Sequence, residues 1–266
     1  MIPSCTDMQM RATPFFFLAV SLAACGGRAL PAPEAAPVPR PSVAPQPPAL
    51  VPAQRPLPGA IRWFRRSAEY RAIVRQTYRL AAERLEALAR GRAAGSWAVV
   101  LDADETVLDN GEYEQRRAEV DSVYTEASWA AWVREAAAPA VPGAAGFMDR
   151  ARRLGGRVVI VTNRADSLCA ATRANLERAG AGADLVLCQA PGGGNKNPRF
   201  ASVENGTAPS TLPPLAVLEY LGDNIQDFPQ MTQAARADTT ALARFGRDWF
   251  ILPNPMYGSW ERNPPN

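Results

Sequence analysis

Residues 97–110 read WAVVLDADETVLDN, an apolar run that ends abruptly in a cluster of acidic residues. A short apolar run between polar residues is typical of a strand buried on both faces, as in a parallel sheet covered by helices. Ligands of such sheets bind beyond the carboxyl ends of the strands, where Asp102 and Asp104 stand two residues apart. Carboxylates this close together are costly unless a cation or a catalytic role compensates their charge, so the segment suggests metal-assisted chemistry.

Four further stretches carry the pattern of a buried strand, and helical patterns separate them. They span residues 157–161, 184–188, 216–221 and 248–252. Strands that alternate with helices predict an α/β domain with a mainly parallel sheet. Because right-handed crossovers place the carboxyl ends of the strands at one rim, the polar residues that follow the strands should converge there. These residues are Asp102, Asp104, Thr162, Lys196 and Asp223.

The segments between the strands predict helices and loops. Residues 61–88 carry apolar side chains near helical spacing, with Arg and Glu between them, and predict a surface helix packed on the domain. The positions expected on its buried face are Phe64, Ile73, Thr77, Leu80, Leu85 and Leu88. Helices are also expected over residues 144–154 and 167–179, and loops over residues 192–200 and 202–214.

The composition excludes several kinds of chemistry. The chain has 266 residues and no histidine, which rules out Ser-His-Asp and Cys-His catalysis and the common zinc sites that contain histidine. The formal charge of +3 is small and the basic residues are scattered, so no nucleic-acid polymer is expected as a partner. Carboxylates must therefore carry any acid-base work.

The basic residues are 28 Arg and a single Lys, Lys196. A Lys ammonium can act as a point charge near a phosphate where the broader guanidinium does not fit. Composition alone leaves two explanations open, namely this requirement and chance.

The N-terminus has the pattern of an export signal. An apolar stretch over residues 14–24 follows a basic residue, is too short to span a bilayer and ends in small residues. Cys25 comes next, so the segment resembles a bacterial lipoprotein signal, which implies that Cys25 is lipidated after residues 1–24 are removed. The residue after this cysteine is Gly26 rather than Asp, and in this respect the chain resembles lipoproteins that are sent on to the outer membrane. Residues 30–58, rich in Pro and Ala, predict an extended tether.

Two cysteines follow the tether. Cys169 and Cys188 can pair in an oxidising periplasm, or each can be a small buried apolar residue, which its apolar neighbours favour slightly. The sequence leaves both alternatives open.

Four motifs, in order, resemble those of the haloacid dehalogenase superfamily of phosphohydrolases. They are LDADET (101–106), VTNR (161–164), NKNPRF (195–200) and GDNIQDF (222–228). Within the superfamily the chain resembles the class C acid phosphatases, bacterial outer-membrane lipoproteins that hydrolyse phosphomonoesters, because it also has ILPNPMYGSWE (251–261) and the lipoprotein signal. Any one motif is weak, but unrelated helix caps and turns have no reason to occur in this order.

The resemblance implies a Rossmannoid three-layer α/β domain with a parallel sheet and a small, mostly helical cap. The predicted organisation is a signal peptide over residues 1–24, a lipidated tether over 25–60 and a phosphatase domain over 61–266, with cap elements at 61–93 and 108–142. Such a protein acts on small phosphomonoesters, including nucleoside monophosphates and aryl phosphates, and reaches the membrane through its lipid anchor only. The oligomeric state stays open, with a dimer among the options.

Each role that the resemblance implies has a physical reason. Asp102 fits a nucleophile that forms an aspartyl-phosphate, since a carboxylate attacks without first losing a proton. Asp104 fits a general acid that protonates the leaving alkoxide and then acts as the base that activates water. In this superfamily an Asp at that position marks phosphatases. Thr162, Asn163 and Lys196 would bind the phosphate.

The resemblance also implies a magnesium ion. Its ligands would be the Asp102 carboxylate, the Asp104 backbone carbonyl and Asp223, and ligation by oxygen alone fits a hard cation. Asp227 would either contribute an outer ligand or bind the waters around the ion, and both roles stay open.

Three aromatic residues are candidates for stacking on a nucleobase or an aryl leaving group. Tyr257 matches an aromatic residue of the family, and Trp129 or Tyr113 is expected to face it from the cap. Base stacking on such rings contributes roughly 1 to 3 kcal/mol. For Trp129 and Trp132, three residues apart, core packing is the more frequent role.

Taken together, these features predict a magnesium-dependent acid phosphatase or nucleotidase held by a lipid anchor at the outer membrane. One alternative is a phosphotransferase of the same architecture, which moves the phosphate to an alcohol instead of water. Another is a non-catalytic surface-binding lipoprotein on a disabled scaffold. The joint presence of Asp102, Asp104, Lys196 and Asp223 argues against the latter.

Overall fold

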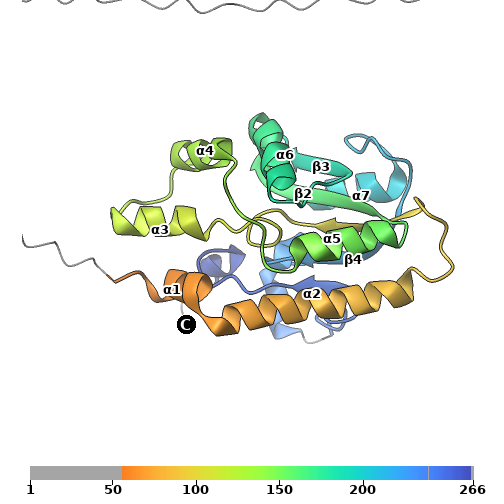
Figure 1. The fold of residues 1–266 in the computed structure, drawn as a ribbon, viewed down its shortest axis with the longest axis horizontal. Helices are drawn as coiled ribbons and strands as arrows, with labels where there is room; N and C mark the ends of the chain where they lie inside the picture. The colour runs from red at the N-terminus through yellow and green to blue at the C-terminus, as the bar shows by residue number, and fades with distance from the viewer. Residues whose placement is uncertain (1–55, 239, 265–266) are drawn as a thin grey trace, which may run out of the picture. The chain divides into compact units, whose positions relative to one another are not determined.

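A five-stranded parallel sheet lies at the centre of the computed structural model, which describes residues 56–238 and 240–264 (Figure 1). The described residues belong to one unit, Pro52–Asn266. Its strands are β1 (Trp97–Leu101), β2 (Arg157–Ala165), β3 (Leu185–Gln189), β4 (Ala216–Gly222) and β5 (Trp249–Ile251). Their order is β3-β2-β1-β4-β5, and every neighbouring pair is parallel. The expected α/β fold is confirmed.

Burial on both faces explains why β1 is apolar along its whole length. All five residues of β1 are buried. Because successive side chains of a strand point to opposite faces, Trp97, Val99 and Leu101 enter one hydrophobic core, while Ala98 and Val100 enter the other. Both neighbouring strands support this register, since Val100 pairs with Val159 of β2 and with Tyr220 of β4.

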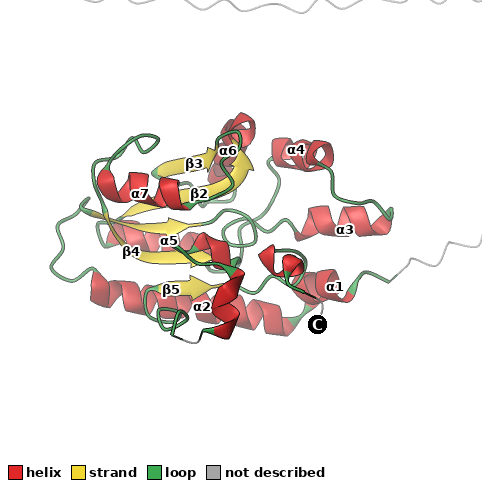
Figure 2. Ribbon diagram, turned by 180° about the vertical axis from the view of Figure 1, so that it is seen from behind, coloured by secondary structure: helices red, strands yellow, loops and turns green. Residues whose placement is uncertain are grey.

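Helices cover both faces of the sheet and complete three layers. On one face lie α2 (Ala68–Leu88), α5 (Ala144–Arg153) and α6 (Cys169–Arg178), and on the other lies α7 (Asn197–Asn205). Figure 2 shows the sheet from the side of α7, with α2 and α5 behind it. Short 3₁₀ helices follow several strands: η1 (Asp166–Leu168), η2 (Ile225–Asp227), η3 (Gln233–Ala237) and η4 (Ser259–Arg262).

Three helices lie beyond the carboxyl ends of the strands, and we refer to them as the cap. They are α1 (Gly59–Arg66), α3 (Gly111–Glu119) and α4 (Glu126–Glu135) (Figures 1 and 2). The segment expected as a first cap element, residues 61–93, divides in the structure. Its first part, α1, contacts α3, whereas α2 packs along α5 and against β4 and β5 as part of the helical layer.

The single helix expected over residues 61–88 is wrong in two respects. The chain leaves α1 at Ser67, whose backbone is extended and whose hydroxyl oxygen accepts a hydrogen bond from the Tyr70 backbone N–H, so a new helix starts there. The buried face of α2 consists of Tyr70, Val74, Tyr78, Ala81 and Leu85. Ile73 and Leu80 are exposed instead. The two stripes lie side by side on the helix, and the buried one contains two tyrosines, whose large rings add to the buried area.

The loops expected over residues 192–200 and 202–214 are also partly wrong, because α7 occupies Asn197–Asn205. Pro198 lies at the start of this helix, where a missing N–H costs nothing, and Gly206 ends it with a φ of 64°. Phe200 and Val203 anchor the helix in the core on that face of the sheet.

The structure decides the alternatives for the two cysteines in favour of a disulfide. Cys169, the first residue of α6, is bonded to Cys188 of β3. The expected signal peptide, the lipidated Cys25 and nearly all of the tether lie outside the described residues. Within the described part of the chain, no helix combines the length and the apolar character needed to cross a bilayer.

Candidate active site

The candidate site lies where the strand order reverses direction, between β1 and β4. These two strands are neighbours in the sheet although they are far apart in the sequence, and such points are where sheets of this type bind ligands. Asp102 follows β1 and Asp223 follows β4. Both line a cavity of about 330 Å³, which Asp104, Asn163, Lys196 and Asp227 also line. The predicted convergence of polar residues at one rim is therefore observed for these side chains.

A buried ammonium joins two of the carboxylates. Lys196 Nζ donates hydrogen bonds to Asp102 Oδ1 and, over 2.7 Å, to Asp227 Oδ1. Only 4% of the lysine side chain is exposed, so water screens these ion pairs little. Burial lowers the pKa of Lys196, but Asp102 and Asp227 outweigh this effect and raise it above its usual value. The single lysine of the chain therefore stays charged beside the expected nucleophile.

The pairing of β1 with β4 fixes the backbone of Asp102. Its backbone N–H donates to the carbonyl oxygen of Leu221, which continues the pairing of β1 with β4. Burial raises the pKa of Asp102 to about 7, with further contributions from Asp227 and Asp104, although the Lys196 ammonium pulls the pKa down. An additional positive charge near Asp102 would favour its ionised form.

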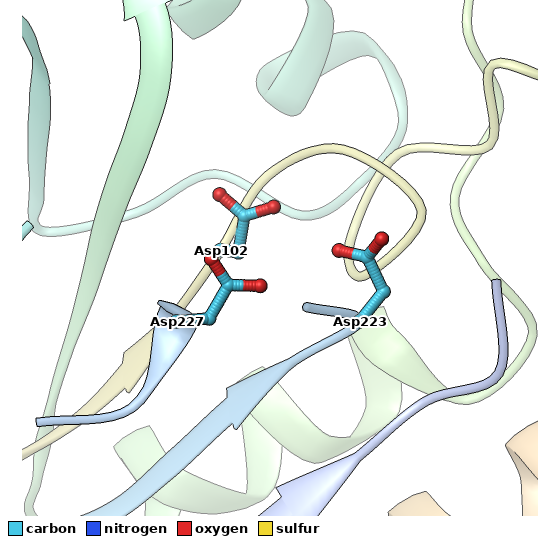
Figure 3. A group of neighbouring side chains, drawn as sticks. All are labelled: Asp102, Asp223 and Asp227. Carbon is cyan, nitrogen blue, oxygen red and sulfur yellow. The ribbon is translucent and has the colours of Figure 1, made fainter. Parts of the chain in front are cut away.

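Three carboxylates face each other at this point (Figure 3). One oxygen from each of Asp102, Asp223 and Asp227 can be chosen so that all three lie within 4.8 Å of one another. Burial raises the pKa of Asp223 well above its usual value, and Asp227 and Asp102 add to this rise. Lys196 balances one of the three negative charges that full ionisation would create. A donor set made of oxygen atoms with an excess of negative charge fits a hard divalent cation.

Contacts from distant segments orient Asp223, and a local contact orients Asp227. Asp223 accepts hydrogen bonds from Asn254 Nδ2 over 2.8 Å and from Thr106 Oγ1 over 3.3 Å. Asp227 Oδ2 accepts from the Asn224 backbone N–H over 2.9 Å. A Cβ atom on Gly222 would lie 2.3 Å from the Cβ of Asp227, so only glycine lets the chain bring Asp227 back over the end of β4.

Asp104 is held by Arg164 of β2 and by Asn110, the residue before α3. Its Oδ1 atom accepts from Arg164 Nε (2.9 Å), Arg164 Nη2 (2.7 Å) and Asn110 Nδ2 (2.8 Å). The side chain is 19% exposed and lines the cavity. The next residue, Glu105, has a φ of 52° and a buried carboxylate that accepts from the Asn110 backbone N–H, so the turn after β1 is fixed from inside.

The expected phosphate-binding residues are placed differently from one another. Lys196 and Asn163 line the cavity. Thr162 is fully buried and is not among the residues that line it, and its hydroxyl oxygen accepts from the Arg164 backbone N–H. Arg199 donates to the Thr162 carbonyl oxygen and, over 2.5 Å, to Asn163 Oδ1. The end of β2 is therefore tied to the first turn of α7, which carries Lys196 at its start.

Of the three aromatic residues expected to bind the substrate, only Tyr257 lines the cavity. Tyr113 is buried within the cap, where its ring packs on Trp129 and Trp132 with centroid distances of 5.2 and 6.2 Å. The Trp129 ring lies 5.4 Å from the guanidinium carbon of Arg164. Both tryptophans of α4 thus pack on Tyr113, and Trp129 also lies beside the arginine that holds Asp104.

Several residues of the site were not predicted. Arg164, Arg199, Glu105, Asn110 and Asn254 all bind or orient a residue discussed above. All five lie in the stretches of sequence quoted above, so their positions were visible in the sequence. Their roles were not visible, because an arginine that is buried against a carboxylate looks the same in a sequence as one on the surface.

Comparisons with known proteins show the family to which this chain belongs. Residues 48–260 match the family HAD superfamily, subfamily IIIB (Acid phosphatase). Two solved structures of the class C acid phosphatase from Bacillus anthracis, one of them with tungstate bound, are similar to this chain. Each match has 32% sequence identity and a TM-score of 0.68, and covers 76% of this chain and 85% of the other. The chain therefore belongs to the acid phosphatases of the HAD superfamily, subfamily IIIB.

Proposed function

We propose that this acid phosphatase hydrolyses small phosphomonoesters through an aspartyl-phosphate on Asp102, with the help of a magnesium ion. The observation that carries the proposal is the contact of Asp102 with the buried Lys196 ammonium, in one cavity with Asp104 and Asp223. A carboxylate nucleophile, an acid-base group and a fixed positive charge are what phosphoryl transfer requires.

In the first step, an oxygen of the Asp102 carboxylate attacks the phosphorus atom. A bond from phosphorus to Asp102 forms while the bond from phosphorus to the leaving oxygen breaks, and Asp104 donates a proton to that oxygen. The alcohol departs and an aspartyl-phosphate remains. Lys196 stabilises the negative charge on the transferring group, because its ammonium lies beside the attacking carboxylate.

The second step regenerates the enzyme. Asp104, now ionised, takes a proton from water, and the water oxygen attacks the phosphorus atom of the aspartyl-phosphate. The bond between phosphorus and the Asp102 oxygen breaks, so that inorganic phosphate and the Asp102 carboxylate are released. Asp104 is left protonated for the next cycle.

The residues present fit a magnesium ion. Asp102 and Asp223 supply carboxylate oxygens, and Asp227 lies within reach of both. Both oxygens of Asp227 already accept hydrogen bonds, Oδ1 from Lys196 and Oδ2 from the Asn224 backbone N–H, so we assign Asp227 mainly to holding the lysine and the end of β4. When bound, the ion would neutralise charge on the phosphoryl group and on the nucleophile.

The proposed substrates are nucleoside monophosphates and aryl phosphates. Tyr257 lines the same cavity as Asp102 and offers a ring on which a base or an aryl group can stack. The structure of the Bacillus anthracis relative with tungstate bound is consistent with a site for a tetrahedral oxyanion. Transfer of the phosphate to an alcohol remains the alternative reaction, and product analysis with added alcohol separates the two.

We also propose that the protein is exported and anchored as an outer-membrane lipoprotein through Cys25. The sequence pattern of residues 14–25 supports this location. The disulfide between Cys169 and Cys188 adds independent support, because such bonds form and persist in oxidising compartments outside the cytoplasm.

The proposal is tested by the Asp102→Asn variant and by removal of metal. We expect Asp102→Asn to lose hydrolysis of p-nitrophenyl phosphate and of nucleoside monophosphates, while the exposed Asp149→Asn exchange serves as a matched control with full activity. We expect exhaustive chelation to abolish turnover by the native enzyme, and added Mg²⁺ to restore it. Turnover that survives either treatment would contradict the corresponding part of the proposal.

A further inference from the structure

The carboxylate of Asp104 is fixed through one of its two oxygen atoms. All three hydrogen bonds described above for Asp104, two from Arg164 and one from Asn110, end on Oδ1. No hydrogen bond from a described residue ends on Oδ2. Because Asp104 lines the cavity, Oδ2 is the atom left to exchange a proton with a bound substrate.

Arg164 is itself held by the cap. Its side chain is fully buried, and its guanidinium lies against the Trp129 ring of α4. Nη2 of Arg164 also donates to Asn110 Oδ1 over 3.2 Å, and the same oxygen accepts from Trp132 Nε1 of α4 over 2.8 Å. Two tryptophans of one cap helix therefore contact the pair of residues that bind Asp104.

In its observed position, Arg164 leaves one of its buried donors without a partner. Nη1 of Arg164 is buried and has no hydrogen-bond partner in the structure. A guanidinium placed only to stabilise the interior would have its donors paired, because unpaired buried donors are unfavourable. In the observed position, Arg164 donates two hydrogen bonds to Asp104 Oδ1.

We propose that Arg164 is a positioning residue that, held between Asp104, Asn110 and Trp129, aims Asp104 Oδ2 at the leaving oxygen and so makes leaving-group protonation depend on the cap. The inference rests on the proposed role of Asp104 as general acid. A general acid must lie within hydrogen-bond reach of the oxygen that it protonates, and a displacement of about 1 Å can cost about 100-fold in rate.

The need for a proton differs between substrates, which gives the test its readout. p-Nitrophenolate departs readily without a proton, whereas the alkoxide released from glycerol 2-phosphate does not. The kcat/KM value covers steps only as far as transfer of the phosphoryl group to Asp102, so it excludes the later attack of water, which is the same for every substrate. A comparison of kcat/KM for the two substrates therefore isolates leaving-group protonation.

The experiment compares Arg164→Met, Arg164→Lys and Asp104→Asn with the native enzyme. For Arg164→Met we expect kcat/KM for glycerol 2-phosphate to fall by about 100-fold and kcat/KM for p-nitrophenyl phosphate by less than about 5-fold. Arg164→Lys, which keeps the charge, should recover part of the loss. The matched control is Arg116→Met, because Arg116 also lies over a tryptophan of α4, at 5.1 Å from the Trp132 ring, but ion-pairs with Glu112 and Glu135 instead. This control should leave both values unchanged.

Equal losses for both substrates in Arg164→Met, or no loss, would overturn the inference, because a purely structural role does not distinguish leaving groups. Asp104→Asn separates this failure from a failure of the proposed function. If Asp104→Asn does show selective loss with glycerol 2-phosphate, the general acid stands and only the role of Arg164 falls. If Asp104→Asn shows no selective loss, the general-acid role of Asp104 and the positioning role of Arg164 are both wrong.

A second variant serves if Arg164→Met does not fold, as judged by its melting curve. Trp129→Leu removes the ring beside Arg164 and should give the same selective loss, about 10-fold in size.

Discussion

At the scale of single residues, the site depends on the shape of one positively charged side chain, that of Lys196. Lys196 fits between Asp102 and Asp227 with almost no exposure to solvent. An ammonium on a flexible stem can approach two carboxylates at once, whereas a planar guanidinium needs more room and presents its donors in a fixed fork. This geometry favours a chemical reason for the single lysine of the chain over chance.

We expect Lys196→Arg to lower kcat for p-nitrophenyl phosphate by about 100-fold to 1,000-fold, the range typical for loss of one preorganised electrostatic contact. The fold should survive, since charge is conserved, and the melting temperature is the check. Arg173→Lys, the reverse exchange at a position on α6, is the control and should be fully active. A Lys196→Arg enzyme with native kcat would show that compactness of the cation is not required.

The residues with a chemical role were easier to predict than the residues that orient them. Asp102, Lys196 and Asp223 stand directly after strands or in loops, where the order of motifs makes them recognisable, and the structure brings them into one cavity. Arg164 and Arg199 share those motifs, but the partners of a buried arginine depend on which segments meet in three dimensions. The same limit applies to Tyr113, which the sequence placed at the substrate and the structure places inside the cap.

At the scale of elements, β4 carries a buried carboxylic acid that has no hydrogen-bond partner. Glu219 is fully buried between the sheet and its helical layer, and neither of its carboxylate oxygens has a hydrogen-bond partner. Burial raises the pKa of Glu219 to about 9, although Arg84 of α2 pulls it down. The side chain is therefore neutral in the folded protein at neutral pH but ionised in the unfolded chain.

This difference makes stability depend on pH. The stabilisation linked to neutral Glu219 is fully present below the pKa of an unfolded glutamate, about 4.5, and is lost as pH rises towards 9. Glu219→Gln has no such proton to lose, so we expect it to match the native protein at pH 4 and to exceed it by about 5 kcal/mol in unfolding free energy at pH 8. Urea denaturation at both pH values measures this, with the exposed Glu83→Gln exchange as control. A Glu219→Gln advantage that is the same at both pH values would contradict the assignment.

The accuracy of the element predictions follows from how strongly each sequence pattern constrains burial. All five strands were located within a few residues, because a strand buried on both faces gives a nearly continuous apolar run in the sequence. The buried face of α2 was misjudged, because Ile73 and Leu80 form an apolar stripe next to the one that is actually buried. The α7 helix was missed because it is short and begins after a Gly-rich stretch that reads as a turn.

At the scale of the whole molecule, one covalent bond fastens the edge of the sheet to its helical layer. The disulfide links α6 to β3, the outermost strand on that side, and closes a segment of 19 residues. Neither cysteine is among the residues that line the active-site cavity. The bond should therefore contribute to stability rather than to catalysis.

We expect the double exchange Cys169→Ser with Cys188→Ser to lower the free energy of unfolding by about 3 kcal/mol, as for a loop of this length, and to leave kcat/KM unchanged at 25 °C. Urea denaturation of the variant and of the reduced native protein should give the same result. Equal stability of the oxidised native protein and the variant would show that the bond does not stabilise the fold.

The central claim is that phosphate passes through a covalent bond to Asp102, and acid quenching during turnover of a radiolabelled phosphomonoester tests it most directly. The account predicts protein-bound label that is released by hydroxylamine, as an acyl phosphate should be, and that maps to the peptide containing Asp102. Phosphate released at the usual rate with no label on the protein, or label on another residue, would contradict the account.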